Sequence, residues 1–167
     1  MLRLRPFKNS DAEFIVKWIT DEKQFYMWSA GRFGEFPLDA KRLCEHYEKS
    51  GDNFFTFTAF DENGVAGHLI IRFLDDKKEE ARLGFIIVDS KIRGKGYGHK
   101  MIELAIKYCF EILMVSKVSL GVFDNNPNAY NCYKACGLKE TGGTWQIKLM
   151  GEDWNCIEMA IEKDEYI

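Results

Sequence analysis

RLGFIIVDSKIRGKGYG, residues 82–98, is the stretch of sequence that decides the fold. Its first half carries four successive apolar residues, 85–88, which is typical of a strand covered on both faces in the middle of a sheet. A glycine-rich loop follows, and beyond it the apolar residues fall on one stripe of a helix. That stripe comprises Met101, Ile102, Ala105, Ile106, Cys109, Phe110, Leu113 and Met114. The stretch therefore predicts a strand, a glycine loop and a long helix.

The glycine loop between the strand and the helix predicts an anion site. Gly94, Gly96 and Gly98 let the backbone turn tightly and approach a ligand closely, and the first amides of the helix have no carbonyl partner. Arg93 and Lys95 add positive charge at the positive end of the helix dipole, so the expected ligand is a phosphate or pyrophosphate. The glycine spacing excludes a dinucleotide fingerprint and a P-loop. An ordinary strand-to-helix connection with basic surface residues is the alternative interpretation.

Composition limits the classes to which this protein can belong. The chain has 167 residues, of which 46% are hydrophobic and 29% charged, and a net charge of −3. These values are typical of one soluble domain, which we expect to span residues 1–167. The mild negative charge argues against a nucleic-acid partner. No segment has the apolar length of a membrane span or the core of a signal peptide, so we expect a cytoplasmic protein without a membrane partner.

The cysteines and histidines form no pattern of a metal or disulfide site. The five cysteines are odd in number and contain no C-x-x-C pair, and the three histidines are isolated from them. Both observations argue against a disulfide framework and a zinc site, so no metal is expected. Cys132 and Cys136 have no neighbouring histidine in the sequence, and we interpret them as buried thiols rather than nucleophiles.

The N-terminal part predicts a strand at residues 2–6 followed by two helices. Ser10 and Glu13 match a capping box, in which the two side chains satisfy the first free amides of a helix that begins there. A second helix is expected over residues 38–49.

An aromatic segment, residues 25–37, separates the two helices. It mixes aromatic rings with glycines, and its pattern is too irregular for a helix and too apolar for a solvated loop. The rings either pack beneath the second helix or line a substrate cleft, since binding pockets are mostly apolar with few polar groups. Trp28 and Phe33 are the candidate substrate-binding residues.

The remaining strands follow from alternation and turn signals. They cover residues 53–60, 65–74, 117–123, 143–150 and 154–161. Asn63-Gly64 predicts a hairpin turn between the first two. The strand at 117–123 should pair in parallel with residues 82–88, because a strand, helix and strand of this length make a right-handed crossover. We therefore expect an α/β fold with a mixed, mostly antiparallel central sheet, one parallel central strand pair and helices on both faces.

A second motif lies after the strand that ends at residue 123. Pro127 fits the first position of a helix capped by Asn126, and Gly137 fits the residue just past its end. Ala129 and Tyr133 share one face of this helix, which brings Tyr133 toward the ends of the central strands. Taken alone, such a tyrosine is either a core residue or a catalytic one.

Together the two motifs, R-x-x-G-x-G from Arg93 and N-x-x-A-x-x-x-Y-x-x-x-G from Asn126, resemble those of the GNAT superfamily of acetyl-CoA-dependent N-acetyltransferases. More loosely, the N-terminal half is similar to the branch of ribosomal-protein N-terminal and aminoglycoside acetyltransferases. The resemblance implies acetyl-CoA as the acetyl donor and a primary amine that attacks it directly in a ternary complex. The acceptor is left open among a peptide N-terminus, an aminoglycoside, a polyamine and another small amine. A homodimer is a further expectation.

The resemblance also implies roles for individual residues. The loop amides would hold the pyrophosphate, and the strand edge and Asn126 would contact the pantetheine arm. Tyr133 would act as the general acid beside the thioester sulfur, and the segment that carries Trp28 and Phe33 would border the acceptor. The implied cofactor-binding residues are Ile86, Ile87, Val88, Arg93, Gly94, Lys95, Gly96, Tyr97, Gly98 and Asn126.

The general base is open at this stage. Some N-terminal acetyltransferases of this kind carry a glutamate base where this chain has Gly121. A typical amine is protonated at neutral pH, so its proton must first pass to Asp75, Glu79, Glu80 or a water chain. A non-catalytic acetyl-CoA-binding sensory module is the alternative function, because Gly121 cannot abstract a proton.

Overall fold

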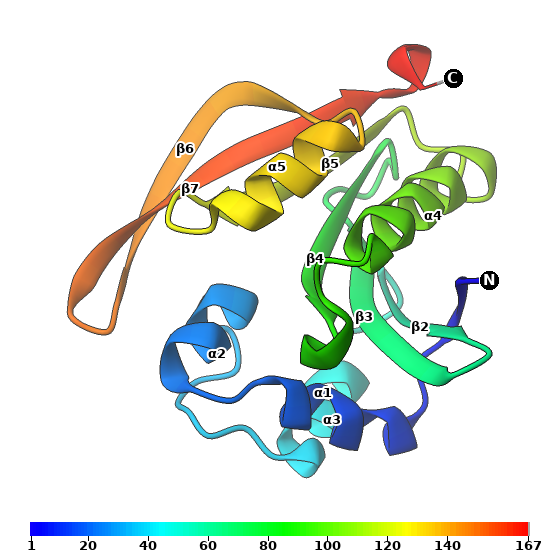
Figure 1. The fold of residues 1–167 in the computed structure, drawn as a ribbon. Coiled ribbons are helices and arrows are strands. Elements are labelled where there is room, and N and C mark those ends of the chain that lie inside the picture. The colour runs from blue at the N-terminus through cyan, green and yellow to red at the C-terminus, as the bar shows by residue number, and fades with distance from the viewer. Residues whose placement is uncertain (167) are drawn as a thin grey trace.

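The computed structural model describes residues 1–166, which build one seven-stranded sheet in the order β1-β2-β3-β4-β5-β7-β6 (Figure 1). Neighbouring strands are antiparallel except β4 and β5, which are parallel. The predicted mixed sheet with one parallel central pair is thus confirmed. The strands are β1 (Arg3–Pro6), β2 (Phe54–Asp61), β3 (Gly64–Phe73), β4 (Glu80–Val88), β5 (Lys117–Phe123), β6 (Lys139–Leu149) and β7 (Glu152–Glu162).

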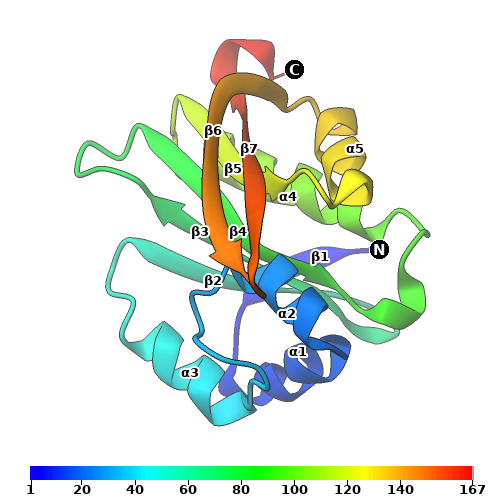
Figure 2. The same ribbon diagram turned by 90° about the vertical axis from the view of Figure 1, so that its left-hand side faces the viewer.

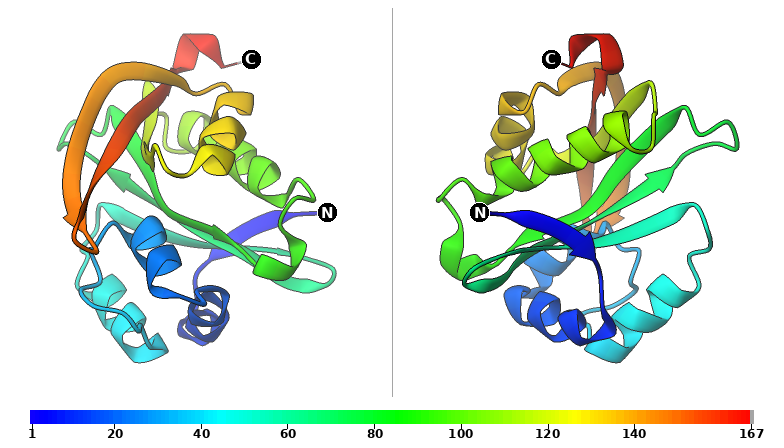
Figure 3. Two further views of the ribbon diagram at one scale, coloured as in Figure 1. Left: turned by 60° about the vertical axis from the view of Figure 1, so that its left-hand side comes forward. Right: turned by 90° about the vertical axis from the view of Figure 1, so that its right-hand side faces the viewer.

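Helices cover both faces of the sheet, as predicted (Figure 3). The long helix α4 (Tyr97–Glu111) buries its apolar stripe on one face and packs beside α5 (Pro127–Ala135). On the other face lie α1 (Ala12–Trp18), α2 (Glu22–Ser29) and α3 (Ala40–Glu48), whose apolar residues form a second core with β3 and β4. Three single turns of 3-10 helix, η1 (Asn9–Asp11), η2 (Ser90–Ile92) and η3 (Lys163–Glu165), complete the chain.

The strands β4 and β5 pair over a short length and then separate. Only residues 80–82 of β4 are in register with β5. Beyond them the register of β4 against β3 shifts at a bulge, where Phe85 has a φ of 45°. Because the bulge adds a residue, Leu83 packs into the core under α4 whereas Phe85 packs into the core of α1–α3. The parallel pair therefore opens at its carboxyl ends (Figures 1 and 2).

The prediction for the aromatic segment was wrong in its first part, because residues 22–29 form the helix α2. The Asp21 carboxylate accepts a hydrogen bond from the Gln24 amide at 2.8 Å and so caps this helix. Ala30 ends it in the left-handed conformation with a φ of 51°. The tip of the β6–β7 hairpin packs on α2, through Leu149 and Trp154 (Figure 2). This contact encloses one side of the space between β4 and β5.

Two helix boundaries also differ from the prediction. The Ser10 capping box is absent, and the first α-helix begins after Asp11, whose carboxylate instead binds Arg5 and Thr58. The long helix α4 ends at Glu111, so Leu113 and Met114, the last residues of its predicted apolar stripe, lie beyond the helix. Met114 is 66% exposed. Within residues 1–166, every helix falls short of the length and apolarity that crossing a membrane requires.

Candidate active site

A cleft of about 1530 Å³ occupies the opening between β4 and β5. One half is lined by the carboxyl half of β4, the glycine loop and α5. The other half is lined by α2, by His46 of α3 and by the ends of β2 and β3. We call these the cofactor half and the acceptor half. Ligand sites of α/β sheets form at such a place, outside the carboxyl ends of parallel strands.

The glycine loop forms an open cradle in the cofactor half. Gly94 and Gly96 have φ values of 77° and 84°, and a Cβ added to either would meet no atom within 4 Å. The first amide to bond within α4 is that of Lys100, which donates to the Gly96 carbonyl at 3.0 Å. The amides of the preceding turn therefore have no carbonyl partner and are available to an anion. This backbone fits the predicted pyrophosphate.

Most residues of the predicted loop line the cleft, with one difference. Arg93, Gly94, Gly96, Tyr97 and Gly98 are lining residues, whereas Lys95 is not. The Arg93 Nε donates to the Val88 carbonyl at 3.2 Å, which holds the arginine against the end of β4. The rest of its guanidinium is exposed and can donate to an anion.

The edge of β4 that faces β5 is unpaired along the cofactor half. Ile86, Ile87 and Val88 line the cleft, and the described residues provide no strand partner for this edge after residue 82. An extended ligand can bond such an edge as a strand would. Asn126 also lines the cleft, while its Oδ1 accepts from the Ala129 amide at 3.3 Å and caps α5 as predicted. The geometry fits a pantetheine arm beside β4.

Tyr133 lies where α5 meets the cleft. Its side chain lines the cleft and the residue is only 8% exposed. Burial raises the pKa of its hydroxyl well above the usual value, and the neighbouring Cys132 and Cys136 thiols raise it further. The hydroxyl therefore keeps its proton at neutral pH, which is the state that a proton donor requires.

A cluster of thiols and a histidine, absent from the sequence-based prediction, lies behind Tyr133. The Cys136 Sγ is 3.4 Å from the His99 Nδ1, and the His99 Nε2 is 3.3 Å from a Glu103 carboxylate oxygen. No histidine is near these cysteines in the sequence, but the packing of α5 on α4 brings His99 to Cys136 in space, and both thiols are half-buried rather than buried as predicted. The neighbouring Cys136 thiol, followed by the charge of His99, lowers the pKa of Cys132, and burial opposes this shift. Cys132 itself lines the cleft.

The two predicted acceptor-binding aromatics occupy different environments. The Trp28 and Phe33 rings stack with centroids 5.0 Å apart and an interplanar angle of 6°. Trp28 lines the cleft, but Phe33 does not and is only 7% exposed. Phe33 packs against Phe85 and His46, with centroids at 4.9 and 4.3 Å. The structure thus makes Phe33 a support for Trp28 rather than a residue of the cleft wall.

The acids considered as bases lie away from the cleft. Asp75, Glu79 and Glu80 are not among its lining residues, and Glu80 faces Lys117 at 4.0 Å instead. Among the titratable residues that line the acceptor half, His46 is the one whose ordinary pKa lies closest to neutral pH. Its side chain is half-buried, and burial followed by the charge of Arg32 lowers its pKa below 6.5. The imidazole is therefore neutral at pH 7.

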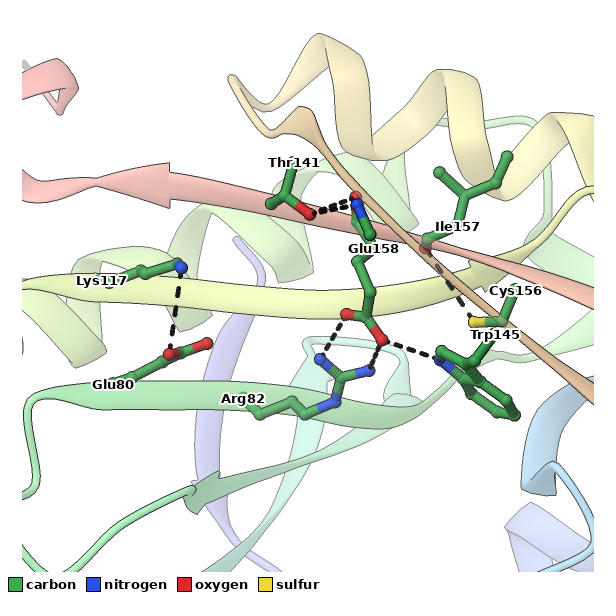
Figure 4. Close-up of polar contacts among 9 residues, drawn as sticks. Glu80, Arg82, Lys117, Thr141, Trp145, Cys156, Ile157 and Glu158 are labelled. Atoms are coloured by element: carbon green, nitrogen blue, oxygen red, sulfur yellow. Dashed lines mark hydrogen bonds and ion pairs between the residues drawn. The ribbon is translucent and has the colours of Figure 1, made fainter.

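An ion pair crosses the floor of the cleft beside Gly121 (Figure 4). Both guanidinium Nη atoms of Arg82 donate to Glu158, at 2.7 and 2.9 Å, and the Trp145 Nε1 donates to the same carboxylate at 2.8 Å. Three donors thus hold one carboxylate. Burial would raise the pKa of Glu158, but Arg82 lowers it below its usual value, so this acid stays ionised and is a weak base. Within residues 1–166, no group of three or more potential ligands could hold a metal ion.

Comparisons with known proteins agree with this geometry. Residues 13–138 match the acetyltransferase (GNAT) family. A spermidine N(1)-acetyltransferase from Vibrio cholerae is 25% identical over 143 residues, which cover 84% of this chain and 80% of that protein. A spermine/spermidine N(1)-acetyltransferase from Bacillus subtilis is 29% identical over 107 residues, 63% of this chain and 68% of that protein.

The likeness extends to solved structures. The crystal structure of the Vibrio cholerae spermidine N-acetyltransferase in complex with CoA and spermine matches with a TM-score of 0.84 and 25% identity, covering 99% of this chain and 97% of that chain. These relatives are named for polyamines, whereas the N-terminal half was expected to resemble acetyltransferases of ribosomal proteins and aminoglycosides. The family match covers well over half of the sequence, and acetyl-CoA is accordingly the acetyl donor. The chain belongs to the GNAT family of acetyltransferases.

Proposed function

We propose that this chain transfers the acetyl group of acetyl-CoA to a small primary amine by direct attack in a ternary complex. The main support is the continuity of the cleft, whose lining runs from the glycine loop past Tyr133 to Trp28 and His46. Both substrates can lie in one cavity, so the reaction needs no acyl-enzyme. The relatives named for spermidine support a small amine, with polyamines among the candidates.

The cofactor half would bind the donor through its backbone. The free amides of the loop and the first turn of α4 would hold the pyrophosphate, assisted by the guanidinium of Arg93. The unpaired edge of β4 at residues 86–88 and Asn126 would hold the pantetheine arm. Bound in this way, the thioester would lie near Tyr133, at the junction of the two halves.

The chain's own residues can then move both protons of the reaction. The amine must lose a proton before its nitrogen attacks, because alkylamines have a pKa of about 10. His46 would accept this proton, directly or through water. An amide of the β4 edge would donate to the carbonyl oxygen as the carbon–nitrogen bond forms. Tyr133 would donate its proton to the sulfur as the carbon–sulfur bond breaks. The second proton, which the nitrogen loses as the amide forms, would pass to the tyrosine oxygen directly or through water and restore the hydroxyl.

Release of the free CoA thiol tests the proposed reaction. The intact protein is incubated with acetyl-CoA and a panel of peptides, polyamines, aminoglycosides and amino carboxylates, and the thiol is followed with a chromogenic disulfide. We expect release that depends on at least one amine, with the acetylated product identified by mass spectrometry. Tight binding of acetyl-CoA without transfer to any amine would support the sensory-module alternative.

The variant Gly96→Val tests the loop separately. A side chain there strains a backbone φ of 84° and obstructs the approach of the ligand. CoA affinity measured by calorimetry should fall about tenfold or more, a change of ~1.4 kcal/mol. Gly151→Val is the matched control, because Gly151 has a φ of 76° in similarly open space but lies in the β6–β7 turn. Unchanged affinity in a folded Gly96→Val variant would remove the loop from the site.

A further inference from the structure

The acceptor half of the cleft is positively charged. Its charged lining residues are Lys23, Arg32, Arg72 and Arg82 on the basic side, against Asp21 on the acidic side. The chain as a whole has a net charge of −3, so this positive potential is local. A concentration of one sign of charge inside a concave site selects ligands of the opposite sign.

Two of these arginines lie side by side on the sheet. Arg72 of β3 and Arg82 of β4 are direct partners in the antiparallel register. Like charges in directly opposite positions destabilise a sheet. Glu158 neutralises one of them, because both of its oxygens are bound by Arg82. The two arginines and Glu158 therefore keep one net positive charge, and Glu158 attracts Arg72 only at a distance, without a hydrogen bond.

Arg72 has unused hydrogen-bonding capacity at the cleft. Its side chain is half-buried and makes neither an ion pair nor a side-chain hydrogen bond with any described residue. Burial lowers its pKa, the charges of Arg32 and Arg82 lower it further, and the charge of Glu158 opposes them in part, so Arg32 adds to the same positive field. Arg32 is exposed and likewise lacks a carboxylate partner among residues 1–166. A guanidinium has five donors, which oxyanions match best.

We propose that the acceptor is a primary amine that also carries an oxyanion, a carboxylate or a phosphate, which Arg72 and Arg32 bind. This inference rests on the proposed function and names its substrate class. A planar guanidinium binds either oxyanion through two parallel hydrogen bonds, which fixes the orientation of the bound molecule. The amine of the same molecule then points toward His46 and the bulge of β4. A polyamine carries positive charges alone and meets like charge in this half.

Steady-state kinetics with matched amines test the proposal. The substrates compared are amino carboxylates from glycine to 6-aminohexanoate, O-phosphoethanolamine, propylamine and spermidine. Propylamine is the reference, because its tail carries no charge. We expect kcat/KM for the best anionic amine to exceed that for propylamine by about tenfold or more, as for a hydrogen-bonded charge pair. The carboxylate and phosphate arms distinguish the two oxyanions. Higher kcat/KM for spermidine than for every anionic amine would overturn the inference and leave the proposed function standing.

The variant Arg72→Gln connects the preference to the residue. It should raise KM for the anionic amine about tenfold or more, leave kcat nearly unchanged, and leave KM for propylamine unaffected. Arg3→Gln is the matched control, because it removes one exposed guanidinium from β1 at the far edge of the sheet. If no amine is acetylated, the proposed function fails. Calorimetric binding of the anionic amines to the CoA complex then decides the inference, and equal affinity in Arg72→Gln and the parent would overturn it.

Discussion

Gly121 on β5 lies against the guanidinium of Arg82 on β4. A Cβ added to Gly121 would stand 2.8 Å from the Arg82 Nη2 and 2.8 Å from the Cys156 Sγ. Figure 4 shows the ion pair of Arg82 with Glu158 reaching across β5, and Gly121 is the register partner of Glu158 on β7, so the pair crosses β5 at the glycine. A glutamate side chain at position 121 and this ion pair exclude each other. The absence of the expected base is thus a consequence of the way the cleft floor is packed.

We predict that Gly121→Ala destabilises the fold. The added methyl group overpacks the site and must displace Arg82 or Cys156, which typically costs about 1–3 kcal/mol. Thermal unfolding of the variant and the parent measures the cost. Adding Cys156→Ala should recover part of the loss, because it removes one of the two clashing atoms. A melting temperature equal to that of the parent would show that the ion pair tolerates a side chain here.

Asp11 provides a prediction on acid stability. Burial alone would raise its pKa, but hydrogen bonds from Arg5, the Lys8 amide and Thr58 lower it from 3.8 to about 2. The folded pKa is depressed, so this carboxylate stabilises the fold above pH ~4, and the contribution is lost as pH falls through about 2. We expect Asp11→Asn to cost about 2 kcal/mol at pH 7, since one pKa unit corresponds to ~1.4 kcal/mol.

Denaturant unfolding at a series of pH values checks this linkage. The difference between Asp11→Asn and the parent should be constant from pH 7 to about 4 and shrink below it. Glu13→Gln is a suitable control, since Glu13 is exposed in the first turn of the adjacent helix α1. A cost that stays the same down to pH 2 would assign the effect to packing instead of charge.

The parts of the fold that could be predicted are determined by short sequence motifs within the element itself. The turn between β2 and β3 lies where Asn63-Gly64 predicted it, with Glu62 and Asn63 in the turn and Gly64 as the first residue of β3, and the Asn126 cap with Pro127 begins α5. In each case the backbone preference of one or two residues determines the geometry, independent of distant contacts. The glycine loop belongs to the same class, since Gly94 and Gly96 adopt the positive φ that glycine reaches freely.

The parts that could not be predicted depend on contacts between distant residues. Helix α2 turns Phe25 toward the core of the sheet and Tyr26 and Met27 toward the β6–β7 hairpin, so no polar stripe marks it as a helix. The Arg82–Glu158 pair joins residues 76 positions apart. Contacts of this kind produce no pattern in the sequence around either residue. The positive charge of the acceptor half could therefore not be predicted from the sequence.

Cys132 should react rapidly with alkylating reagents at neutral pH. The neighbouring Cys136 thiol, together with the charge of His99, lowers its pKa, so a larger fraction is thiolate than in an ordinary cysteine. Burial raises the pKa of Cys109 to about 12, which makes it the slow internal reference. Mass spectrometry after iodoacetamide treatment should show Cys132 modified first, and acetyl-CoA should protect it. Equal rates at the two cysteines would refute the thiolate assignment.

His46 should determine the acidic limb of the pH profile. Only its neutral form can accept the amine proton, so kcat/KM should rise with pH through a value below 6.5 and then level off. His46→Gln should lower the plateau by ~10²–10⁴-fold, the usual contribution of a general base, and remove this limb. A variant that keeps both the limb and the rate would show that another group takes the proton.

Tyr133→Phe tests the proton donor of the reaction. Phenylalanine keeps the packing of a ring that is 8% exposed and deletes only the hydroxyl, so the fold and CoA affinity should stay close to those of the parent. The effect has an upper limit, because a thiol with a pKa of about 8–9 is a fairly good leaving group even without assistance. We therefore expect kcat to fall toward the ~10²–10⁴-fold range of general acid catalysis without complete loss of activity.

The choice of leaving group offers a second measurement on the same variant. If Tyr133 protonates the departing sulfur, a donor with a more acidic thiol needs less assistance, and its transfer rate should be less sensitive to Tyr133→Phe. Comparing acetyl-CoA with an aryl thioacetate under single-turnover conditions measures this difference. A tyrosine that serves only for packing would slow both donors equally. If the kcat of Tyr133→Phe with acetyl-CoA stays within about twofold of the parent, the change is far smaller than a general acid's contribution. Tyr133 would then be a packing residue and not the proton donor.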